Sequence, residues 1–376
     1  LVSAGADTIF LDDDFRLARG PGVIGGCFCD DHRKRFCDGH GYSPAQWDGL
    51  LADVNDRRLS PILKDWVNFT CDELTACFRA QQNATPAFQL GNMVMYLGAE
   101  KAGIRLDDYR GVPLRVGELM FDDKSFGTVR GKTNELFSAL FHRGYVSPEL
   151  AFSETTAYPS DKLSAANMAA KLTISTLADV RHTMFMSGVT PFPITHWDTL
   201  ALAMREQAQI HARVSGQMPT GPFQFYWGDG SRFVGQDDPY SLFMATGVPF
   251  GMATDLNYRM HSTPYEGQVI FVNDADFIDL PSLPVSLMVS RIPRDGVRAV
   301  PETLEALFAL KRELRPQWND VPLIDEDKPA VCAWYARAGG VIVWNLADTQ
   351  EAFTVVRGET RRSIELGPLA SSFVEI

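Results

Sequence analysis

The sequence predicts an α/β protein in three parts: parallel strands alternating with helices, then a small α/β unit, then an antiparallel β unit. Over about the first two hundred residues, short apolar runs alternate with stretches of helical periodicity, which is typical of parallel strands with crossover helices. From about Gly216, buried strand patterns mix with only two helical segments. From Ala330 onward only strand patterns remain, separated by turns such as Ala338-Gly339-Gly340.

The first part contains five strand–helix units. We expect strands at Thr8–Leu11, Phe88–Tyr96, Pro113–Phe121, Glu149–Ser153 and His182–Met186, and helices at Ala45–Asn55, Pro61–Gln82, Lys132–Arg143, Lys162–Val180 and Trp197–Val214. A closed (β/α)₈ TIM-type barrel needs three more units upstream. Leu1–Ala6 resembles the end of a helix and has no initiator Met, so we expect a barrel that lacks its N-terminal strands. An open doubly wound sheet is the alternative.

The chain of 376 residues is longer than one hydrophobic core usually serves, and we place its parts at residues 1–215, 216–318 and 319–376. The middle part is expected to be Rossmann- or flavodoxin-like, with strands at Phe223–Trp227, Phe250–Thr254 and Val269–Val272 and helices near Pro239–Thr246 and Pro301–Leu314. The last part is expected to be a β-sandwich, with strands at Val331–Ala336, Gly340–Asn345, Ala352–Arg357, Arg362–Leu366 and Ser371–Glu375.

Composition excludes several classes of partner. A formal net charge of −12 argues against nucleic acid, because binding to phosphates requires a basic surface. No window of eighteen apolar residues predicts a membrane span. The six cysteines are unevenly placed and do not resemble a disulfide framework, which favours a reducing, cytoplasmic location while leaving localisation open.

The first candidate site is the run Asp12-Asp13-Asp14, which directly follows the expected strand Thr8–Leu11. Barrel enzymes carry their chemistry at the carboxyl ends of the strands, so these carboxylates are expected to point into a cleft. Three adjacent carboxylates repel one another, and burying more than one requires a metal, a shared proton or a cationic transition state. A loop of solvated acids with a helix N-cap is the alternative interpretation.

The second candidate is Glu154, expected where the strand Glu149–Ser153 ends. Hydrolysis of a glycosidic bond requires two carboxyl groups, one to protonate the leaving oxygen and one to attack or to activate water. Glu154 and the Asp run would supply this pair, although a helix N-cap is again the alternative. Glu118 competes for the same role, and its alternative is a strand-end salt bridge with Arg115.

A third candidate is the segment Cys27-Phe28-Cys29-Asp30-Asp31-His32. Two thiols and an imidazole within six residues would supply three ligands of a tetrahedral zinc ion. Cys37, His40 or a residue from upstream would supply the fourth. The site would be structural, because its ligands lie on a loop after the acids. Reduced cysteines packed as small apolar residues are the alternative.

Further residues are expected to bind substrate rather than to react with it. Trp197 lies just past a strand end, where its ring would stack on a sugar face, and His196 would donate a hydrogen bond to a hydroxyl group. Packing is an equal alternative for aromatic residues in such loops. The full set of candidate substrate-binding residues is Asp12, Asp13, Glu118, Trp197 and His196.

At these residues the sequence resembles the glycoside hydrolase family 42 β-galactosidases. In that family the fourth barrel strand ends in an Asp-Asn-Glu run, which a Cys-aromatic-Cys-x-x-Cys zinc loop and a Phe follow. The order of barrel, small α/β domain and β domain is also similar over nearly the whole chain. The matching residues here are Asp12-Asp13-Asp14-Phe15, then Gly25-Gly26-Cys27-Phe28-Cys29-Asp30-Asp31-His32, then Phe36.

The resemblance implies a retaining clan, with the acid/base after strand four and the nucleophile after strand seven. If Thr8–Leu11 is strand four, Asp14 takes the acid/base position and Glu154 the nucleophile position. The sequence departs from the pattern in three places, where Asp13 replaces Asn, Asp14 replaces Glu and His32 replaces Cys. A shorter acid widens the gap between the carboxyl groups and favours inversion, so we do not carry over a preference for galactose.

The sequence therefore predicts a glycosidase that acts on an O-glycosidic bond of an oligosaccharide or glycoside and needs no cofactor for catalysis. Asp14 would protonate the leaving group, Glu154 would be the nucleophile or base, and Asp13 would orient the substrate or raise the pKa of Asp14. Two alternatives stay open: a non-catalytic carbohydrate-binding barrel, and a barrel enzyme that holds a divalent metal at Asp12–Asp14. Homo-oligomer formation also stays open.

Overall fold

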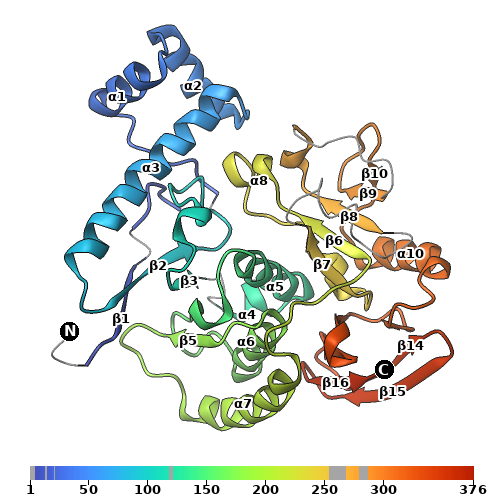
Figure 1. Cartoon of the computed structure of the whole chain (residues 1–376). Coiled ribbons are helices and arrows are strands. Elements are labelled where there is room, and N and C mark those ends of the chain that lie inside the picture. The colour runs from blue at the N-terminus through green and yellow to red at the C-terminus, as the bar shows by residue number, and fades with distance from the viewer. Residues whose placement is uncertain (1–4, 13–14, 21, 118–121, 254–267, 279–286) are drawn as a thin grey trace.

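The computed structural model describes residues 5–12, 15–20, 22–117, 122–253, 268–278 and 287–376 (Figure 1). The first sheet is entirely parallel, in the order β1-β2-β3-β4-β5. Its strands are β1 (Thr8–Leu11), β2 (Gln89–Met95), β3 (Leu114–Gly117), β4 (Ala151–Thr156) and β5 (His182–Met186). All five expected strands are thus confirmed in position, although residues 118–121 of the expected strand Pro113–Phe121 lie outside the described residues. The expected helix end at Leu1–Ala6 lies mostly outside the described residues.

This sheet is curled into a half-barrel. The rings of Phe10 in β1 and Phe152 in β4 lie 4.8 Å apart, edge to face, although two strands separate them. Neighbouring strands are about 4.8 Å apart, so a flat sheet would hold β1 and β4 about 14 Å apart. The curl therefore gives the sheet a concave face, onto which side chains from distant strands converge.

The boundaries of β4 correct one expectation, because Glu154 lies inside the strand and not after it. The strand begins at Ala151 and continues through Thr155 and Thr156, which pair with Phe185 and Met186 of β5. β-Branched threonines suit an extended backbone, and this favours continuation of the strand past Ser153.

Helices precede or follow the strands of this sheet. They are α1 (Asp30–His40), α2 (Pro44–Asp56), α3 (Pro61–Ala84), α4 (Asp123–Phe126), α5 (Val129–Arg143), α6 (Ala165–Ala178) and α7 (Ile194–Val214), with short 3₁₀ segments η2 (Leu106–Tyr109) and η3 (Pro148–Leu150). Ser43 and Ser60 cap α2 and α3, and a proline follows each cap at the first helical position. α1 and α2 extend away from the rest of the molecule, beside one end of α3 (Figure 1).

Helix α1 was not expected, because the sequence indicated a metal-binding loop over this stretch. Only Phe36 of the helix is buried, so the segment has little of the apolar periodicity by which a helix is recognised. Phe36 joins a small aromatic core with Trp47 of α2 and Trp66 of α3. This core holds the three helices together.

The second sheet is also parallel in every pairing. Its order is β10 (Arg298–Ala299), β9 (Leu287–Ser290), β8 (Val269–Val272), β6 (Phe223–Tyr226) and β7 (Phe250–Ala253). Counted from its own first strand this order is 2-1-3-4-5, as in flavodoxin-type sheets. The accompanying helical segments are α8 (Asp229–Phe233), η4 (Leu242–Ala245), η5 (Asp274–Ile278), α10 (Leu304–Leu314) and η6 (Arg315–Gln317). The helix expected at Pro239–Thr246 is only the short 3₁₀ turn η4, which the left-handed Gly247 follows.

The C-terminal part consists of two three-stranded antiparallel sheets, as expected. One contains β11 (Leu323–Ile324), β14 (Glu351–Arg357) and β15 (Thr360–Leu366), and the other contains β12 (Ala330–Tyr335), β13 (Gly340–Asn345) and β16 (Ser371–Glu375), with η7 (Ala336–Ala338) between β12 and β13. Both sheets contribute to one buried cluster, which includes Cys332, Val343, Phe353 and Val355.

A single large apolar core connects all three parts of the chain. Phe137 of α5 lies with its ring 4.3 Å from that of Phe225 in β6, which joins the first part to the second. The Tyr335 hydroxyl in β12 donates to the Leu177 carbonyl in α6 at 2.7 Å, which joins the third part to the first. Among the described helices, none is both long and apolar enough to cross a membrane.

Because Phe225 belongs to this shared core, Phe225→Ala should lower the free energy of unfolding by about 3–5 kcal/mol. We expect one cooperative transition for the whole described core, shifted to lower denaturant, in tryptophan fluorescence and circular dichroism alike. Ile194→Ala, at a position 83% exposed, is the control and should change stability by less than about 0.5 kcal/mol. Two separated transitions in the wild type would contradict a shared core.

Candidate functional site

Glu154 lies on the concave face of the first sheet, and its side chain is only 5% exposed. The strand register sets this position, because side chains alternate between the two faces. Glu154 pairs with Gly117 of β3 and Met184 of β5. The side chains of Met93 and Met95 pack over Gly117, whereas Met184 is 36% exposed. The carboxylate is therefore enclosed, and the exposed side chains of this face belong to the neighbouring strand β5.

Arg115 is the residue that organises this site. Its Nη2 donates to Asp12 Oδ1 at 2.6 Å, and its Nε lies 3.1 Å from Glu154 Oε2. The contact between Arg115 Nε and Glu154 Oε2 is an ion pair, but its geometry does not meet that of a hydrogen bond. The Thr156 hydroxyl donates to Glu154 Oε1 at 3.0 Å. One guanidinium thus contacts carboxylates from the end of β1 and from the middle of β4.

The charges of this cluster do not cancel. Within the described part of the chain, Asp12 and Glu154 both contact the Arg115 guanidinium, and these three groups by themselves carry a formal charge of −1 when both acids are ionised. Asp12 is 69% exposed, whereas Arg115 and Glu154 are enclosed. A buried ion pair is destabilised strongly by the loss of one partner, which makes Arg115 necessary for Glu154 to be buried here.

Aromatic rings pack beside the cluster of Asp12, Arg115 and Glu154. The Arg115 guanidinium lies 5.2 Å from the centre of the Phe10 ring, within range of a cation–π interaction. Phe10 contacts Phe152, which stacks on His182 at 4.1 Å. His182 is exposed and its Nε2 hydrogen-bonds to the Glu149 carbonyl at 3.1 Å. The rings thus form a continuous layer on the concave face.

Three of the candidate residues lie outside the described residues: Asp13, Asp14 and Glu118. The separation of the Asp14 and Glu154 carboxyl groups therefore stays a prediction. Asp12 is described, and its contact with Arg115 places the beginning of the acidic run on the same face of the sheet as Glu154.

Trp197 and His196 lie elsewhere. Trp197 lines a groove between α6, β5 and α7 together with Thr183 and Phe185. Thr183 donates to Ser175 of α6 at 2.7 Å, so this groove is on the helix-covered face, opposite to Glu154. His196 Nε2 hydrogen-bonds to the Leu163 carbonyl at 3.0 Å. The structure does not bring either side chain to the Glu154 cluster.

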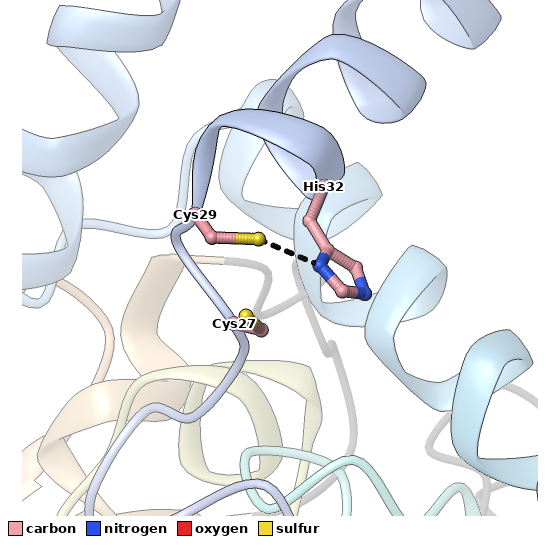
Figure 2. A group of neighbouring side chains, drawn as sticks. All are labelled: Cys27, Cys29 and His32. Atoms are coloured by element: carbon pink, nitrogen blue, oxygen red, sulfur yellow. Dashed lines mark hydrogen bonds between the residues drawn. The ribbon is translucent and has the colours of Figure 1, made fainter.

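The predicted zinc ligands do come together. Cys27, Cys29 and His32 place one ligand atom each within 4.8 Å of one another (Figure 2). Cys29 is the residue before α1 and His32 is in the first turn of that helix, so the helix start brings them within 3.1 Å, Sγ to Nδ1. The His32 imidazole is the main reason that the pKa of Cys29 falls from 9.0 to about 7, with a further contribution from Cys27.

This donor set fits zinc chemistry. A tetrahedral zinc ion with Zn–S bonds of about 2.3 Å holds its ligand atoms about 3.5–4 Å apart, so small side-chain rotations would suffice. A thiol with a lowered pKa reaches the thiolate form, the form that binds metal, at lower pH. Cys37 and His40, the expected fourth ligands, do not belong to the group among the described residues. Because His32 lies on α1, the expectation of a ligand loop is corrected to a loop and a helix start.

No protein-family model matches this chain, and no curated protein matches it. The site is therefore interpreted from its own geometry. Sequence reasoning assigned Arg115 only as a partner of Glu118 and missed its contacts with Asp12 and Glu154. An arginine in the apolar run Leu114-Arg115-Val116 is a signal of a buried charge that needs partners.

The lowered pKa of Cys29 predicts unusual reactivity. Because the pKa is lowered, the thiolate forms at lower pH, and alkylation of Cys29 by iodoacetamide should reach half its maximal rate near pH 7. His32→Ala should move this profile of the Cys29 rate to higher pH, as measured by peptide mass spectrometry. Cys77, exposed on α3, is the internal control whose rate should not respond to the His32 substitution. An unchanged Cys29 profile would contradict the geometry.

Zinc binding can be measured separately. One equivalent of Zn²⁺ should protect Cys27 and Cys29 from alkylation, and Cys29→Ser should weaken binding of a chromophoric Co²⁺ probe by about a hundredfold. Cys77→Ser is the matched control and should leave Co²⁺ binding unchanged. If the wild-type protein shows no thiolate-to-cobalt absorption, the cluster is not a metal site.

Proposed function

We propose that this chain is a glycosidase that acts on an O-glycosidic bond of an oligosaccharide or glycoside and is related to the glycoside hydrolase family 42 β-galactosidases. The observation that carries this proposal is the shared contact of Asp12 and Glu154 with one guanidinium. A bond flanked by two carboxyl groups is the common requirement of this chemistry. The contact supports a common cleft for the acidic run and Glu154, which lie about 140 positions apart.

The charge of the cluster suits this reaction. Glycoside hydrolysis passes through an oxocarbenium-like transition state that carries positive charge. A pre-organised cluster with a formal charge of −1 favours that charge relative to the neutral substrate. In the proposed mechanism Glu154 attacks the anomeric carbon or activates water, Asp14 protonates the leaving oxygen and Asp13 orients the sugar. Arg115 is a positioning residue that holds Glu154 in place.

We also propose that β1 to β5 correspond to strands four to eight of a (β/α)₈ barrel. The curl that brings Phe10 to Phe152 supports this assignment. The strand count supports it as well, because the acidic run follows β1 and Glu154 lies three strands later, the spacing of acid/base and nucleophile in the resembled family.

The decisive substitution is Glu154→Gln, which keeps the shape and removes the charge. Turnover of the best substrate in a panel of nitrophenyl glycosides should fall by about 10³-fold or more, because the nucleophile or base is lost. Glu149→Gln is the matched control, since Glu149 precedes the same strand but is 61% exposed and pairs with Arg181. The control should retain wild-type rates. Equal rates for wild type and Glu154→Gln would reject the assignment.

Two further readouts separate the alternatives. Saturable sugar binding in calorimetry with no hydrolysis of the whole panel would reject catalysis in favour of a carbohydrate-binding barrel. Activity that is lost with a chelator and restored by Mg²⁺ or Mn²⁺ would favour a metal at Asp12–Asp14. For an active enzyme, the anomer first released, followed by NMR, distinguishes retention from inversion.

A further inference from the structure

A cleft lies near the amino ends of the strands β3 and β4 of the first sheet. Its volume is about 450 Å³, within the range of small-molecule sites. It lies between the first part of the chain and the second, where the end of α5 meets β7. Its lining includes Arg110, Arg143, Arg232, Tyr145, Met218 and Met252. Three arginines from three separate elements thus line the same cleft.

Each of the three guanidinium groups is held in place by an ion pair or by hydrogen bonds to neighbouring residues. Arg110 pairs with Asp107 at 2.8 Å, and Arg232 pairs with Glu100 at 2.5 Å. Arg143 Nε donates to the backbone carbonyls of Ala178 and Asp179 at 3.0 and 3.1 Å. These contacts fix the orientation of the cations in advance, so a ligand does not have to order them.

Each of the three guanidinium groups has a carboxylate partner, but only one of these carboxylates, Asp107, is part of the lining itself. The residues that form the wall include three arginines and one carboxylate, Asp107. The nearest carboxylate to Arg143 is 3.9 Å away, and its other partners are neutral carbonyls. Burial lowers the pKa of Arg143, although Asp179 opposes the shift. The Nε–H of Arg232 is buried without a hydrogen-bond partner among the described residues.

The remaining wall is apolar or aromatic. Tyr145 lies with its ring 5.3 Å from the Arg110 guanidinium carbon, and burial raises its pKa to about 12, so its hydroxyl stays protonated and can donate. Met218 and Met252 contribute flexible thioether side chains. A cleft with guanidinium groups and a protonated phenol on an apolar wall is suited to an anionic group on a compact body.

We propose that this cleft binds a small organic anion, whose phosphate or carboxylate contacts Arg110, Arg143 and Arg232 and whose apolar or ring-shaped body packs on Tyr145, Met218 and Met252. The cleft is distinct from the proposed catalytic site. Arg110 precedes β3 and Tyr145 precedes β4, whereas Glu154 lies toward the other end of β4. The proposal does not depend on glycosidase activity.

The test uses the full chain and three probes: phenyl phosphate, benzoate and inorganic phosphate. Calorimetry should give saturable one-to-one binding of phenyl phosphate or benzoate, tighter than that of inorganic phosphate because the ring packs on the apolar wall. Arg110→Gln should weaken binding by about tenfold through loss of a charged donor. Met218→Glu places a negative charge, the same sign as that of the ligand, at an exposed position of the lining. It should weaken binding of the anion at least tenfold.

Arg205→Gln is the matched control, because it removes the same charge from an exposed position on α7, away from the cleft, and should change binding less than twofold. Circular dichroism checks folding, and if Met218→Glu misfolds, Arg110→Gln alone decides. Absence of saturable binding, equal affinity for inorganic and phenyl phosphate, or equal losses in Arg110→Gln and Arg205→Gln would overturn the proposal. Tighter binding of phenyl phosphate than of benzoate would identify phosphate as the preferred group.

Discussion

The curl of the first sheet is the constraint on which the Glu154 site depends. In a flat parallel sheet, with neighbouring strands about 4.8 Å apart, side chains of β1 and β4 would be separated by the width of three strand spacings. The curl brings Phe10 against Phe152, and Arg115 then contacts Asp12 and Glu154 at once. The register places all five residues on the concave face, whereas a shift of one residue in any strand would turn its side chains toward the helices.

Electrostatics explains why this constraint matters. Glu154 is enclosed, and an enclosed carboxylate is tolerated only with a compensating charge or hydrogen bonds. Arg115 and Thr156 supply these, while Asp12 competes for the same guanidinium from the exposed side. Among the described residues, both carboxylates of the cluster thus have the same cationic partner.

The three parts of the chain share one continuous apolar core. The core runs from α5 through β6 to β12, so the second and third parts support the sheet that holds Glu154. The arginine-lined cleft forms where the first two parts meet, and neither part supplies its wall alone. The cysteine–histidine group lies at the start of α1, which packs through Phe36 on its own aromatic core.

Local sequence pattern determined the five strands of the first sheet, the separation of the parallel and antiparallel parts, and the proximity of Cys27, Cys29 and His32, because each depends on neighbours along the chain. Only the tertiary structure decided where the side chains of Arg115 and Trp197 lie and what they contact. Arg115 contacts residues 103 positions before it and 39 after it. Trp197, on α7, lines a groove on the helix-covered face of β5, opposite to Glu154. Such contacts depend on the curl of the sheet and on which face a helix covers, and these arise from packing between distant elements rather than from the periodicity of any one segment.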